Sequence, residues 1–89
     1  MIQNYDGMRK GRNKWEIIHD VLKVLAEKKN QKKTRIMQRA NLDWNSFHRY
    51  FKFLIEENFI AENTQECYEI TGKGKELHDR LTFFNDMKL

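Results

Sequence analysis

Apolar side chains recur every three to four residues in separate stretches of this chain, and this spacing limits it to a mainly helical fold. The clearest stretch runs from Lys14 to Lys29. Its apolar positions are Trp15, Ile17, Ile18, Val21, Leu22, Val24 and Leu25. A stripe of this width predicts a well-buried first helix.

Two further helices are expected downstream. Residues 33–40 form a short helical candidate with one small apolar face. Asp43 stands where an N-cap belongs, because its carboxylate can accept free backbone amides at the positive end of a helix dipole. A third helix is expected from Trp44 to Asn58, since asparagine can end a helix in the left-handed conformation. Its apolar side carries Phe47, Phe51 and Leu54.

After Asn58 the pattern changes to that of a β-hairpin followed by a helix. Phe59 to Glu62 and Cys67 to Ile70 have the composition of short strands. Thr71 can cap a last helix. The apolar residues of that helix are Leu77, Leu81, Phe83, Phe84, Met87 and Leu89. The predicted fold is mainly α with a small β-hairpin: a winged helix-turn-helix plus a C-terminal helix.

With 89 residues, of which 39% are hydrophobic, the chain can fill one modest core. We expect a flexible basic arm over residues 1–13, a winged-helix domain over 14–70 and a C-terminal helix over 71–89. The net charge is +4, and it is unevenly distributed. Residues 1–55 contain 13 Lys or Arg and 5 Asp or Glu, whereas residues 56–89 contain 4 and 8. This asymmetry indicates one positive surface, for which a nucleic acid is the simplest partner.

Cys67 is the only cysteine, and the N-terminus has no charged segment followed by an apolar signal core. An intracellular, cytoplasmic location is therefore expected. No apolar run approaches the roughly 18 residues that a membrane helix needs. We expect no insertion into a membrane.

The third predicted helix carries the side chains that a DNA-contacting helix needs. Asn45 can pair with adenine and Arg49 with guanine, while Lys52 suits a phosphate. The start of the second helix, within an acid-free basic run, can form a phosphate site. The predicted DNA-binding residues are Lys32, Lys33, Thr34, Arg35, Asn45, Ser46, His48, Arg49 and Lys52.

Two other segments bear on DNA binding. Basic residues of the arm could follow a groove, namely Arg9, Lys10 and Arg12. The tip of the predicted wing is polar but uncharged (Asn63, Thr64, Gln65), and three acids surround it, namely Glu62, Glu66 and Glu69. We expect the wing to contribute little to phosphate contact unless these glutamates face away.

Nothing in the sequence predicts catalysis. The neighbouring pairs His19-Asp20 and His78-Asp79 should diverge by about 100° on their helices, so we interpret both as surface pairs. Cys67 and the histidines lack metal-ligand spacing, and residues 72–74 are too short for a phosphate-binding glycine loop. We expect no catalytic residues, no metal and no cofactor.

Three segments resemble an archaeal winged helix-turn-helix family of small predicted transcriptional regulators. They are KTRIM at residues 33–37, ANL at residues 40–42 and YxITxKG at residues 68–74. The similarity extends from about Arg12 to Leu81. It implies a winged-helix fold that binds duplex DNA through Trp44 to Lys52 and forms homodimers through the C-terminal helix. Asn58 replaces the usual glycine, and the C-terminal helix is shorter than in members with a long antiparallel coiled coil.

By this resemblance, Lys33, Thr34 and Arg35 face phosphates, and residues 71–74 start the dimerisation helix. The dimer interface would contain Leu77, Leu81, Phe84 and Met87. The leading interpretation is thus a homodimeric transcriptional regulator that binds double-stranded DNA in the nucleoid. Two alternatives stay open: a non-specific architectural chromatin protein, and a protein-interaction module that uses exposed Phe53 and Phe83.

Overall fold

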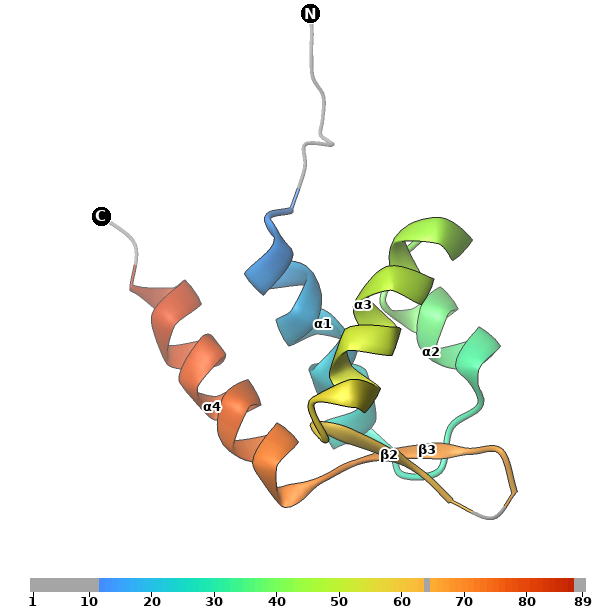
Figure 1. Ribbon diagram of the computed structural model, residues 1–89. Helices are drawn as coiled ribbons and strands as arrows, with labels where there is room; N and C mark the ends of the chain where they lie inside the picture. The colour runs from blue at the N-terminus through green and yellow to red at the C-terminus, as the bar shows by residue number, and fades with distance from the viewer. Residues whose placement is uncertain (1–11, 64, 88–89) are drawn as a thin grey trace, which may run out of the picture.

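The computed structural model describes residues 12–63 and 65–87, which form four helices and one antiparallel hairpin (Figure 1). The elements are α1 (Lys14–Glu27), α2 (Lys33–Arg39), α3 (Trp44–Glu56), β2 (Ile60–Glu62), β3 (Tyr68–Ile70) and α4 (Gly72–Asp86). This order is that of a winged helix-turn-helix with an added C-terminal helix. The predicted fold class is therefore confirmed.

Side-chain caps fix the starts of three helices. Asp43 accepts a hydrogen bond from the backbone amide of Ser46 ahead of α3, and Thr71 accepts one from Gly74 ahead of α4, as predicted. Asn13 caps α1 in the same way. Because each cap satisfies a backbone amide that has no partner inside the helix, it sets where the helix begins. Asn13 therefore belongs to the helical unit and not to the arm expected over residues 1–13.

Asparagines in the left-handed conformation end or link the helices. Asn58 has φ 64°, which stops α3 as predicted, although the helix itself ends two residues earlier at Glu56. Asn30 and Asn41, each with φ 58°, lie in the connections on either side of α2. Asparagine tolerates this conformation better than other non-glycine residues. These positions let three helices follow one another over short turns.

The core is built around α1, which lies between α4 on one side and α2 and α3 on the other (Figure 1). The buried residues are Ile18, Val21, Leu22, Val24 and Leu25 of α1, Ile36 and Ala40, Phe47, Phe51 and Leu54 of α3, Ile60, Tyr68, Ile70 and Leu81. All of the elements contribute to this one cluster. Helices α2 and α3 are thus held by the same core that holds α4.

Buried Gln31 connects the hairpin to the end of α1 through hydrogen bonds. In the hairpin, Ile60 pairs with Ile70 and Glu62 pairs with Tyr68. Gln31 exchanges two backbone hydrogen bonds with Tyr68, with N···O distances of 3.1 and 2.8 Å. The Gln31 side chain also donates to the carbonyl oxygen of Val24 at 2.8 Å, near the end of α1. Gln31 therefore sets the position of the hairpin relative to the helices.

Candidate nucleic-acid interface

Helix α3 has one buried and one exposed side. Phe47, Phe51 and Leu54 are buried in the core. The predicted contact residues Asn45, His48, Arg49 and Lys52 are exposed. Residues four positions apart are neighbours on a helix surface, so Asn45 adjoins Arg49 and His48 adjoins Lys52. The exposed side of α3 therefore presents an amide, an imidazole and two cations together.

Ser46 has a role at the helix start. Hydrogen bonds from its side chain and its backbone amide lower the pKa of the Asp43 carboxyl below the usual 3.8. Asp43 is therefore ionised at neutral pH, where its charge favours the N-terminus of α3. Ser46 is half-buried, unlike the exposed contact residues that follow it.

A pocket of about 310 Å³ lies where α2, α3 and the hairpin meet. It brings together three of the predicted residues, Lys33, His48 and Lys52. The ammonium of Lys33 lies 5.7 Å from the centroid of the Phe51 ring, which can hold a cation over its face. Two acids, Glu56 and Glu62, also line the pocket. Its charge is therefore mixed.

A second pocket, of about 400 Å³, lies at the outer side of α2. It contains the predicted residues Lys32, Thr34 and Arg35 together with Lys28, which was not predicted. The other residues that line it are Asn30, Gln31 and Gln38. Because its charged side chains are all basic, this pocket has the electrostatics of a phosphate site.

Two of the three hairpin glutamates do not face away from α2. Glu62 and Glu66 line a pocket of about 320 Å³ together with Lys32, Lys33 and Thr34. Burial raises the pKa of the Tyr68 hydroxyl above its usual 10.0, and the negative charges of Glu62 and Glu66 raise it further. The potential beside the hairpin is thus less positive than at the outer side of α2.

Arg12 does not lie in a free arm. Its guanidinium contacts the Asp20 carboxylate at 2.7 Å and donates to the carbonyl oxygens of Ala40 and Asn41 at 2.8 and 2.7 Å. It therefore holds the turn between α2 and α3 against α1, which corrects its assignment as an arm contact. Arg9 and Lys10 lie outside the described residues, and their contacts stay a prediction.

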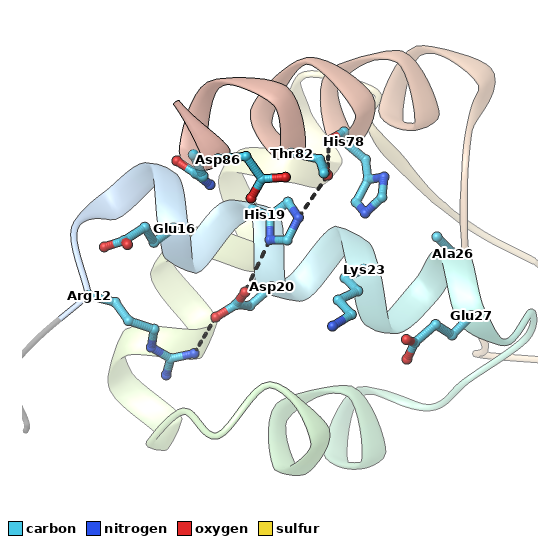
Figure 2. Close-up of a pocket in the computed structure, with 11 residues that line it drawn as sticks. Arg12, Glu16, His19, Asp20, Lys23, Ala26, Glu27, His78, Thr82 and Asp86 are labelled. Atoms are coloured by element: carbon cyan, nitrogen blue, oxygen red, sulfur yellow. Dashed lines mark hydrogen bonds and ion pairs between the residues drawn. The ribbon is translucent and has the colours of Figure 1, made fainter. Parts of the chain in front are cut away.

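The interpretation of His19-Asp20 as a surface pair is wrong. His19 Nδ1 lies 3.1 Å from Asp20 Oδ1, and its Nε2 lies 2.9 Å from Thr82 Oγ1 on α4 (Figure 2). The ring of His19 stacks on that of His78 with centroids 5.0 Å apart. Adjacent side chains meet here because α4 packs against α1 and confines the imidazole. These residues line a pocket of about 570 Å³ between the two helices.

The predicted dimer residues divide between two environments. Leu81 is only 8% exposed and belongs to the core of its own chain, against which Leu77 also packs. Phe84 and Met87 are each 64% exposed. Phe83, which was not among the predicted dimer residues, is 69% exposed. Phe83, Phe84 and Met87 are therefore accessible for contact with a partner, whereas Leu81 already packs in the core of its own chain.

Trp44 lies at the first position of α3. The resemblance places it at the start of the DNA-contacting segment, although its spacing also continues the apolar stripe of Phe47, Phe51 and Leu54. The indole is 53% exposed. The exposed side of α3 thus includes a large aromatic residue.

The fold and this exposed helix define the class. The chain belongs to the winged helix-turn-helix family, whose model matches residues 11–89. It is 44% identical over 70 residues to the uncharacterized protein MJ0287 of Methanocaldococcus jannaschii, a match that covers 79% of this chain and 70% of that protein.

Two solved structures share the fold. Sso10a-2, a DNA-binding protein from Sulfolobus solfataricus, matches with a TM-score of 0.74 and 26% identity over 85% of this chain and 81% of that one. The PcaV transcriptional regulator from Streptomyces coelicolor matches with a TM-score of 0.66 and 18% identity. That match covers 74% of this chain and 51% of the regulator, and at this identity it shows the fold alone. In the described part of the chain, no helix is long and apolar enough to cross a membrane.

Proposed function

We propose that the protein is a homodimeric regulator that binds double-stranded DNA with α3 in the major groove. The observation that carries the proposal is the exposed row of Asn45, His48, Arg49 and Lys52 on a helix whose opposite side is buried. The similar protein Sso10a-2 is itself a DNA-binding protein. A helix presented in this way fits the width of the major groove.

The exposed side chains differ in what they can recognise. Asn45 and Arg49 can each make two hydrogen bonds to a base edge, the first to adenine and the second to guanine. Lys52 and the basic pocket that contains Lys32 and Arg35 supply phosphate contacts, which set orientation without selecting sequence. Thr34 in that pocket can add a hydroxyl hydrogen bond. The acidic hairpin would lie away from the phosphate backbone of the DNA, because its glutamates carry the same charge as the phosphates.

A second copy of the chain is the proposed partner for the outer side of α4. Phe83, Phe84 and Met87 project there with nearly two thirds or more of their surface exposed. Large apolar residues gathered on a surface mark contact sites. Pairing through them would present two copies of α3 to one duplex. Such a protein would act in the cytoplasm, on the nucleoid.

The DNA-binding test is fluorescence anisotropy with a labelled duplex of mixed sequence, at about 50 to 200 mM salt. We expect the affinity to fall steeply with salt, since each neutralised phosphate contributes about 0.9 to the slope. Lys52→Ala should reduce that slope by about one for each copy bound. Arg49→Ala should weaken binding to a preferred duplex by about 1–3 kcal/mol. Lys75→Ala is the matched control, because Lys75 is exposed on α4.

The outcomes separate the candidate functions. Binding that is weakened equally for all sequences by every variant would indicate an architectural protein in place of a sequence-selective regulator. An absence of binding at the lowest salt would refute the proposal and favour a protein-interaction module. Phe53, which is 38% exposed, and Phe83 would then be the candidate contacts.

Light scattering tests the dimer. The intact protein should have twice the mass of the 10.9 kDa chain. Phe84→Ser should shift it toward the monomer while the circular dichroism of the helices is unchanged. Leu81→Ala, which opens a cavity in the core, should instead lower stability by about 2–5 kcal/mol. A monomeric intact protein would contradict the proposed pairing.

A further inference from the structure

Trp44 occupies the first position of α3 with half of its surface open. One face of the indole stacks on the imidazole of His48, with ring centroids 5.5 Å apart and an interplanar angle of 27°. Phe47 lies on the core side, 6.4 Å away between centroids and tilted by 36°. The indole is therefore supported by its own helix and still 53% exposed. A rigid aromatic held at a surface in this way loses little conformational entropy on contact with a partner.

The surroundings of Trp44 point to the partner. The first turn of α3 lies at the end of the helix that is distant from the hairpin and its glutamates (Figure 1). The exposed residues that follow are Asn45, His48 and Arg49, which can all donate hydrogen bonds. In helix-turn-helix proteins the N-terminal residues of this helix are the ones that contact base edges. The aromatic side chain is therefore continuous with the proposed DNA-contacting surface.

We infer that Trp44 contacts the 5-methyl group of thymine in the major groove and gives the protein a preference for thymine at one position of each half-site. That methyl is the one apolar group that a base pair presents in the major groove. In a duplex the faces of the bases are already stacked, so an indole can meet the methyl edge and not a base face. His48 stacks on the indole and so limits its rotation. The inference rests on the proposed DNA binding by α3.

Uracil provides the test, because it pairs as thymine does and lacks only the methyl group. A preferred duplex is selected from a random pool and resynthesised with uracil in place of thymine, one position at a time. We expect the intact protein to lose about fourfold in affinity per contacted methyl, the effect of removing one buried methyl-sized group. Trp44→Ala should bind the thymine and uracil duplexes equally. Trp44→Phe, which keeps an aromatic ring, should retain part of the discrimination.

Trp15 supplies the control and a second readout. It is the other of the two tryptophans and lies on α1. Trp15→Phe should discriminate between thymine and uracil duplexes as the intact protein does. The fluorescence of Trp44, its remaining tryptophan, should change when the duplex binds. Salt-dependent binding without discrimination at any thymine would overturn the role of Trp44 and leave DNA binding standing. Tighter binding to single strands would also overturn it, while no binding to any duplex would refute both inferences.

Discussion

A single methyl group added at Gly74 should disturb the fold. A Cβ atom placed there would lie 2.1 Å from the backbone carbonyl oxygen of Phe59 and 2.8 Å from Cγ1 of Ile70. The carbonyl oxygen is backbone and cannot rotate away. Gly72, the first residue of the same helix, offers the matched control, since a Cβ there meets nothing within 4 Å. We therefore compare Gly74→Ala with Gly72→Ala.

The structure allows the cost to be worked out. Relieving the contact requires α4 to move away from Phe59, and overpacking of this kind costs about 1–3 kcal/mol. The same carbonyl oxygen accepts a hydrogen bond from the backbone amide of Thr71 at 3.1 Å. Weakening this bond adds about 1 kcal/mol. Alanine regains up to about 1 kcal/mol of helix propensity. The net loss for Gly74→Ala is about 2 kcal/mol, whereas Gly72→Ala should be neutral or stabilising.

Urea denaturation followed by circular dichroism measures this difference. Both variants and the parent must be compared at one protein concentration, because association shifts apparent stability. For a domain of this size, a loss of about 2 kcal/mol should also lower Tm by roughly 8–16 °C. A Gly74→Ala protein as stable as the parent would refute the close approach of α4 to Phe59. Equal destabilisation by both substitutions would show that backbone flexibility, and not the missing Cβ, is what matters.

Two further predictions concern charged groups at the helix ends. The lowered pKa of Asp43 means that its stabilising contribution is full above the ordinary value of 3.8 and is lost as the pH falls through the folded-state pKa. Asp43→Asn keeps a capping oxygen but does not titrate, so its unfolding free energy should fall less between about pH 5 and 3. Arg12→Ala should destabilise the fold by about 1–2 kcal/mol and leave the salt dependence of DNA binding unchanged. A reduced salt slope at full stability would restore Arg12 as a DNA contact.

Local chemistry made much of the fold predictable. Asp43 and Thr71 have side chains that can cap a helix, and both do so. The YxITxKG segment can now be explained in physical terms: Tyr68 and Ile70 are buried, Thr71 caps α4, and Gly74 allows the close approach to Phe59. The two caps depend on residues near one another in sequence, which is why their residue types were sufficient to predict them.

Features that depend on how α4 packs were not predictable in this way. His19 meets Thr82 across 63 positions of sequence and also contacts its neighbour Asp20. Leu81 lies on an apolar stripe that fits a partner or its own core equally well, and the structure places it in the core. Trp44 shares the spacing of the buried stripe of α3, yet its indole is 53% exposed, so spacing alone does not decide between core and surface at the end of a helix.

The placement of α1 explains how one small domain can carry the two proposed contact surfaces. Because α4 and α3 pack on different sides of α1, the outer side of α4 and the exposed side of α3 do not compete for the same space (Figure 1). Arg12 and Asp20 join the turn before α3 to α1, and His19 joins α1 to Thr82 of α4. Pairing through Phe83, Phe84 and Met87 would therefore fix the orientation of each α3 through a chain of direct contacts. In such a dimer, the spacing between DNA half-sites would be set by α4 and the bases selected by α3.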